Sequence, residues 1–168
     1  GQVNVQLPSE LTPTQQFPIL VSANNAFTMP DTLDIVPLKP AVAGFPDGHI
    51  IAQHSTDFSL VDGTHTAKPG EFLVMYLLGM GPTAPLVPTG VASPAVPLAT
   101  VVNSPTVLVG GRNAQVFFAG LTPGLAGLYQ INFQLPAGIP AGDADVVVSQ
   151  TGPLGTVFVN VTKLPVTN

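Results

Sequence analysis

The sequence predicts an all-β protein, built as an antiparallel β-sandwich, on three observations. Short runs rich in Val, Ile, Phe and Thr recur along the chain, and Gly, Pro, Asn and Asp separate them. No segment free of Pro and Gly keeps the apolar spacing of an amphipathic helix over a helix length. Several runs alternate apolar and polar residues, which indicates strands with one buried face. Many short strands separated by such turns are typical of a sandwich.

The candidate strands are bounded by turn residues on both sides. They are residues 2–7, 17–23, 32–37, 49–54, 57–61, 71–78, 106–110, 114–119, 128–135, 144–150 and 155–162. In residues 130–135 the odd-numbered positions are apolar and the even-numbered positions are amides. This alternation predicts that one side of that strand faces the core and the other faces solvent.

Glycine and proline mark the connections. Gly110-Gly111 lies between two apolar runs and predicts a hairpin corner, with Arg112-Asn113 in the turn. Residues 82–105 are rich in Pro, Ala, Val, Ser and Thr, and we expect a long extended loop because proline cannot donate to a strand ladder. Asp34 is expected to blunt an edge strand with its charge.

One motif occurs twice. Gln2-Val3-Asn4-Val5-Gln6-Leu7-Pro8 returns as Gln130-Ile131-Asn132-Phe133-Gln134-Leu135-Pro136. A self-match at a long period indicates a repeated domain. We therefore divide the chain into the C-terminal third of a repeat at 1–40 and a complete sandwich domain at 41–168.

Several runs in the second part also point to a family. They are, in order, Ala67-Lys68-Pro69-Gly70-Glu71, Leu78-Gly79-Met80-Gly81-Pro82-Thr83, Val109-Gly110-Gly111, Phe118-Ala119-Gly120-Leu121-Thr122-Pro123-Gly124, Gly127-Leu128-Tyr129-Gln130-Ile131-Asn132 and Leu135-Pro136-Ala137-Gly138-Ile139-Pro140-Ala141-Gly142. With these runs, residues 45–163 resemble a family of uncharacterised C-terminal domains in large secreted bacterial proteins. Residues 1–40 resemble the end of the same domain more weakly.

The resemblance implies an immunoglobulin-like antiparallel β-sandwich, here with extra N-terminal strands. It also implies an extracellular or cell-surface location in a bacterium. The family carries no established activity, so the resemblance supplies a fold and a setting and no chemistry.

Composition narrows the function classes. Hydrophobic residues make up 45% of the 168 residues and charged residues only 8%, against about 25% charged in an average protein. Such low charge suits a secreted or assembled structural protein. The four basic residues, Lys39, Lys68, Arg112 and Lys163, are dispersed, so nucleic-acid binding is not expected. The longest apolar run, residues 72–78, is too short for a membrane-spanning helix.

Cofactor and metal signals are weak. Cysteine is absent, which removes thiol catalysis and cysteine-bound zinc. His49, His54 and His65 lack metal-ligand spacing, and we expect them to be solvent-facing strand and turn residues. Asp143 and Asp145 could present two carboxylates on one strand face to calcium, but calcium needs six to eight oxygens and the run has no calcium-loop motif. We favour a turn followed by an exposed strand start, with no cofactor.

Catalysis finds no support in the motifs. Gly-x-Ser-x-Gly does not occur, and Gly79-Met80-Gly81 lacks the third glycine of a dinucleotide loop. The two tyrosines, Tyr76 and Tyr129, could belong to a sugar-binding platform. For Tyr129 we favour a structural role, in which its hydroxyl closes a corner by bonding to the backbone. We therefore expect no enzyme.

The first forty residues raise the main functional question, because apolar strands without partners invite pairing with another chain. They could pack on the same chain, complete the sheet of a neighbouring molecule, or be an arbitrary cut through a tandem array. We expect the second, self-association by strand exchange into a fibre or surface layer. The donated apolar contacts would be Leu7, Ile19, Val21, Leu33 and Ile35. The alternative is a carbohydrate- or protein-binding module that uses the loop 82–105.

Overall fold

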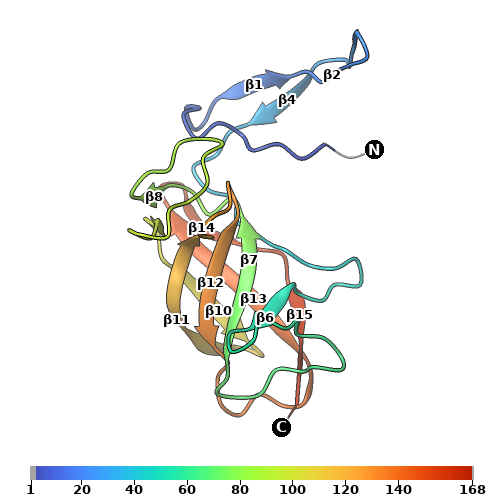
Figure 1. Ribbon diagram of the computed structural model, residues 1–168, viewed down its shortest axis with the longest axis vertical. Coiled ribbons are helices and arrows are strands. Elements are labelled where there is room, and N and C mark those ends of the chain that lie inside the picture. Colours follow the sequence, from blue (N-terminus) through green and yellow to red (C-terminus); the bar gives the residue numbers. More distant parts are fainter. Residues whose placement is uncertain (1–2, 168) are drawn as a thin grey trace.

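A computed structural model describes residues 3–167, and every regular element in that part of the chain is a β-strand. Figure 1 shows two parts: a larger sandwich-like body and a small hairpin, made by β1 to β4, that extends from one end of that body. The strands are β1 (Gln16–Ile19), β2 (Ser22–Ala23), β3 (Ala26–Phe27), β4 (Asp31–Asp34), β5 (Ala41–Val42), β6 (Ala52–His54), β7 (Phe72–Leu78), β8 (Thr83–Ala84), β9 (Thr100–Val101), β10 (Pro105–Val109), β11 (Arg112–Leu121), β12 (Tyr129–Gln134), β13 (Gly142–Gly152), β14 (Gly155–Phe158) and β15 (Thr162–Val166). The all-β prediction is confirmed. No helix in the described residues is long and apolar enough to cross a membrane.

The large sheet is antiparallel along its path β14-β13-β10-β11-β12-β7-β5. β15 adds to β13, β6 adds to β7, and the short β8 and β9 attach through β11. β11 joins the two halves of the path, because residues 112–114 pair with β10 and residues 115–121 pair with β12. A β-bulge between Val116 and Phe118 bends the strand along the part that pairs with β12.

The two halves enclose one core. Leu73, Met75 and Leu77 of β7 and Phe133 of β12 cluster with residues of β10, β13 and β15 from the other half. The alternation predicted for residues 130–135 is confirmed, since Ile131, Phe133 and Leu135 are buried and the amides between them are half-exposed. The apolar face of each half is therefore covered by the other half.

The hairpin at Gly110-Gly111 forms, but its turn is tighter than expected. Val109 pairs with Arg112, so Gly110 and Gly111 alone make the turn, with φ of 53° and 75°. Two consecutive positive φ angles define the hairpin turn that matches strand twist, and glycine adopts them without strain. Arg112 and Asn113 therefore lie in β11, and their predicted place in the turn is wrong.

Tyr129 has the structural role that the sequence indicates. Its hydroxyl donates a 2.5 Å hydrogen bond to the Gly81 carbonyl. Burial raises the pKa of Tyr129, which keeps the phenol protonated and able to donate. The predicted hydrogen bond from Tyr129 to the backbone is confirmed, but its acceptor lies 48 residues earlier in the chain, whereas the tyrosine corner of immunoglobulin-like domains bonds to backbone only a few residues upstream.

Other boundaries differ from expectation. No strand forms over residues 3–7 or 57–61, and residue 2 of the first run lies outside the described residues. The expected strand 155–162 is instead β14 followed by a break, and β15 begins at its last residue. The loop 82–105 carries two short strands, β8 and β9, at its two ends. β5 is the first strand along the chain to join the large sheet, and the division at residue 40 stays a prediction.

Candidate assembly site

The repeated motif occupies two different environments. In β12 its apolar side chains, Ile131 and Phe133, are fully buried between β7 and β11. In the N-terminal copy, Val3 and Val5 are each 70% exposed and Leu7 is 46% exposed. The same pattern of residues is therefore a core strand in one place and a solvent-exposed segment in the other. We call residues 3–35 the arm.

The rest of the arm is an amphipathic hairpin. Phe17 of β1 lies opposite Leu33 of β4, and Gln16 lies opposite Asp34. Side chains alternate across a strand, so Phe17, Ile19 and Leu33 share one half-buried face while Gln16 and Asp34 share the polar one. On the polar face the Gln16 amide donates a 2.6 Å hydrogen bond to the Asp34 carboxylate.

The hairpin closes through β2 and β3 over a tight turn. Asn24 and Asn25 form the turn with φ of 52° and 59°. Asparagine tolerates this region better than other non-glycine residues. β1 and β4 nevertheless make a sheet of two strands only. A hairpin of this kind is marginally stable in water without a surface to cover its apolar face.

Polar contacts hold the first part of the arm against the body. The Gly90 amide donates to the Gln6 side chain at 2.9 Å, and the Ser9 amide donates to the Thr89 hydroxyl at 2.7 Å. Thr89 in turn donates to the Glu10 carboxylate at 2.8 Å, which lowers the pKa of Glu10. These bonds are exposed to solvent, so each contributes little to stability.

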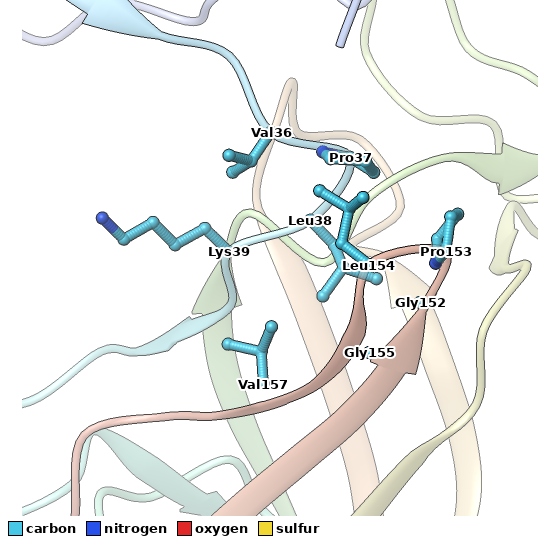
Figure 2. Close-up of a pocket in the computed structure, with 9 residues that line it drawn as sticks. All are labelled: Val36, Pro37, Leu38, Lys39, Gly152, Pro153, Leu154, Gly155 and Val157. Carbon is cyan, nitrogen blue, oxygen red and sulfur yellow. The ribbon is translucent and has the colours of Figure 1, made fainter. Parts of the chain in front are cut away.

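An apolar cleft lies where the arm joins the sandwich (Figure 2). Its volume is about 270 Å³, and its walls are the connection 36–39 on one side and the β13–β14 turn on the other. Leu38 is buried and lies against Gly152, where a Cβ atom would come within 2.4 Å of the Leu38 side chain. In Figure 2 the Lys39 side chain points away from the cleft, while Leu38 and Leu154 lie across it.

One edge of the large sheet adjoins this cleft. β14 pairs with β13 on one side, and no backbone pairing covers its other side among the described residues. The Val159 amide bonds to the Val148 carbonyl, so ladder alternation turns the N–H and C=O of Thr156 and Phe158 outward. By contrast, residues 48, 50 and 67 cover the edge of β15 with backbone hydrogen bonds. β14 is therefore an open strand edge beside an apolar cleft.

The predicted donor residues are placed in two ways. Leu7 and Val21 are exposed, whereas Ile19, Leu33 and Ile35 are half-buried within the arm. Their role as donated contacts stays a prediction. Leu38 was not predicted, because nothing in the run Pro37-Leu38-Lys39-Pro40 indicates that it packs against a glycine more than a hundred residues away.

The two candidate calcium ligands have cationic or titratable neighbours. Asp145 makes a 2.5 Å ion pair with Lys163, its neighbour across the β13–β15 ladder. Asp143 lies 3.4 Å from the His49 ring, which also contacts Asp47 at 3.1 Å. Hydrogen bonds from His49 to Asp47 and Asp143 raise the pKa of His49. Within residues 3–167, no group of three His, Asp or Glu side chains is arranged to hold a metal.

His54 departs from expectation, because it is buried and not solvent-facing. Its Nδ1 lies 2.5 Å from a Glu71 oxygen and its Nε2 lies 3.2 Å from the His65 carbonyl. Only the protonated ring can donate from both nitrogens. Burial lowers the pKa of His54, but the bonds to Glu71 and to the His65 carbonyl outweigh it and the pKa is raised. The spacing of the sequence carries the signal, because His54 lies two residues after Ala52 and therefore shares its face of the strand.

Stability is expected to fall as pH rises through neutrality because of His54. A folded-state pKa above the ordinary value of 6.5 contributes stability that is complete below 6.5 and is lost as pH passes the folded pKa. Thermal unfolding should therefore show a lower Tm at about pH 8.5 than at about pH 5.5. The pKa of His49 is also raised, so His54→Gln should remove only the part of this difference that His54 contributes. His65→Gln, at an exposed position, should retain the whole difference. An unchanged slope in His54→Gln would contradict the assignment.

Comparison of the chain with protein-family models and with curated proteins finds no match.

Proposed function

We propose that this protein is a non-catalytic structural or adhesive module of a bacterial cell surface, with an immunoglobulin-like sandwich. It would assemble with other copies through its arm. The exposure of Val3 and Val5, at motif positions that are fully buried in β12, carries the proposal. Burying such side chains against another chain stabilises association, and the low charge of the sequence suits a packed assembly.

The acceptor in this proposal is the open edge of β14. An extended segment can add to a sheet edge by main-chain hydrogen bonds, and alternate side chains then enter neighbouring apolar pockets. The outward backbone N–H and C=O groups of Thr156 and Phe158 supply the hydrogen bonds. The cleft beside Leu38 and Leu154 supplies the apolar pocket. A donor on the arm and an acceptor on the body are two different surfaces, so they give a head-to-tail contact, which builds filaments.

Sedimentation velocity of the full chain over a range of concentrations tests the proposal. We expect concentration-dependent growth, and Val5→Lys should raise the concentration needed for assembly at least about tenfold by placing a charge in a buried contact. Val96→Lys is the matched control, because Val96 is 88% exposed on the loop 82–105. A chain that stays monomeric at all concentrations would overturn the proposal.

A second pair of variants tests the acceptor separately. Thr156→Pro removes an outward N–H and leaves the β13–β14 ladder intact, because proline is tolerated at an open edge. Thr156→Ala keeps that N–H and should assemble like the parent chain. If Val5→Lys blocks assembly and Thr156→Pro does not, the arm is the donor and β14 is not its acceptor.

The second candidate function is a binding module for carbohydrate or protein. The outward side of β7, β12 and β11 favours it, because this side carries amides and the exposed rings of Phe72 and Phe117.

A further inference from the structure

The outward side of β7, β12 and β11 carries amide and aromatic side chains and no charge, and two of its residues, Val74 and Gly120, are buried. In the ladder, Gln134 lies between Phe72 and Gln115, and Asn132 lies between Val74 and Phe118. One step further, Gln130 lies between Tyr76 and Gly120. Cross-strand partners share a face, so amides line the middle strand and aromatic rings stand on both sides. We call these residues the outer face.

The β-bulge adds a further aromatic ring, that of Phe117, to this face. Phe117 is the extra residue between the pairs Val116–Phe133 and Phe118–Asn132, where the register shifts. Phe117 contacts Phe72 with ring centroids 5.2 Å apart and an interplanar angle of 56°. Phe117 remains 53% exposed and Phe72 48% exposed. Two phenyl rings in contact at the surface are an apolar patch that a ligand can cover.

The amides are held in place and keep capacity for a ligand. Gln130 donates to Asn132 at 3.1 Å, and Gln134 donates to the Gly70 carbonyl at 2.9 Å. A primary amide offers two donor and two acceptor positions. Each of these bonds uses only one position of each amide, so the others remain for a ligand. The bonds restrict side-chain rotation, which lowers the entropy lost on binding.

A hollow lies at the Phe72 end of the outer face. Its volume is about 340 Å³, within the range of small-ligand sites. Its lining is Gly70, Asn113, Gln115, Gln134, Leu135, Pro136 and Ala137. Gln115 and Gln134 belong both to this hollow and to the outer face. The hollow and the aromatic pair therefore form one surface.

The charge of the site selects the ligand class. The outer-face and hollow side chains named above are uncharged, and the nearby Glu71 carboxylate is engaged by His54 and by the Lys68 amide. The Arg112 guanidinium lies beside Gly138, at the far side of the hollow, but along the aromatic pair and the amides of β12 a charged ligand would lose water without gaining an opposite charge. A neutral sugar presents hydroxyls, which amides bind, and C–H faces, which cover aromatic rings.

We propose that the outer face binds a neutral oligosaccharide, with Phe72 and Phe117 against the sugar C–H surface and with Gln115, Asn132 and Gln134 bonded to its hydroxyls. This inference does not depend on assembly through the arm. It also places the binding surface on the sheet and not on the loop 82–105.

Isothermal titration of the full chain tests the site. The probes are neutral hexasaccharides of β-1,4-glucose, β-1,3-glucose, β-1,4-mannose, β-1,4-xylose and β-1,4-N-acetylglucosamine. We expect at least one of them to bind, and Phe117→Ala to weaken that binding about tenfold or more. Gln134→Ala should weaken it as well. Phe45→Ala is the matched control, because Phe45 is 40% exposed and lies outside the outer face, the arm and β14.

The outcomes separate the possibilities. Absence of binding to every probe overturns the proposal, and so does binding that Phe117→Ala leaves unchanged or that Phe45→Ala weakens equally. If Phe117→Ala instead reduces self-association without sugar present, the outer face is a protein interface. Thermal unfolding of each variant confirms that the exposed substitution leaves the fold intact.

Discussion

Phe133→Ala is expected to lower the free energy of unfolding by about 3–5 kcal/mol, while Val5→Ala lowers it by less than about 0.5 kcal/mol. The two residues occupy the same position of the repeated motif. Phe133 is fully buried between β7 and β11, so its removal loses transfer free energy and leaves a cavity. Val5 is mostly exposed, so little contact is lost. Guanidinium unfolding followed by circular dichroism at high dilution measures both values.

Ile131 and Val3 provide an independent pair at the neighbouring motif position. Ile131→Ala should cost about 2–5 kcal/mol and Val3→Ala close to nothing. Equal losses for the two copies of the motif, at concentrations where the chain is monomeric, would mean that the arm is buried against its own body in solution. Such a result would remove the exposure on which the assembly proposal rests.

Gly79→Ala is expected to cost about 2–4 kcal/mol. Gly79 has φ of +71°, and a Cβ atom there would lie 2.3 Å from the Lys39 carbonyl oxygen. The substitution therefore combines left-handed backbone strain with a clash against main chain, which cannot rotate away. The Gly79 carbonyl also accepts the Lys39 amide at 2.9 Å, so the clash falls on the connection between the arm and the sandwich.

Gly124→Ala separates the two contributions. Gly124 has φ of +81°, and a Cβ atom at this position would meet nothing within 4 Å beyond its own chain neighbours. Only the backbone strain remains there, at about 1–2 kcal/mol. Chemical unfolding of both variants gives the comparison. Equal losses would show that the connection moves aside at no cost, and that Gly79 does not position the arm.

The strands of the sandwich could be predicted because their signals are local. Alternation in residues 130–135 and the glycine pair at 110–111 depend on neighbours in the chain, and both predict structure that forms. The same reasoning fails at residues 3–7. There the motif is present, but no strand forms in the described part, because a strand requires a partner and β7 and β11 already bind β12.

Buried polar groups also separate what local sequence predicts, which is the face of the strand, from what it does not predict, which is the hydrogen-bond partner. Val146, Val148 and Gln150 alternate on the buried side of β13, so the period of the sequence places Gln150 inward. Its partners could not be predicted: the amide donates to the Met80 and Asn103 carbonyls, at 3.0 Å and 2.7 Å. Those carbonyls are 70 and 47 residues away. Long-range contacts of this kind depend on how the two halves of the sheet meet.

In the candidate sites, too, local signals could be predicted and long-range contacts could not. The sequence by itself determined the all-β class and the core positions of β12, because side-chain periodicity and turn residues act over a few positions. Only the tertiary structure decided that β14 keeps an open edge beside Leu38, that His54 faces Glu71, and that Phe117 reaches Phe72. Strand pairing and a β-bulge bring these residues together, and both depend on segments distant in the chain.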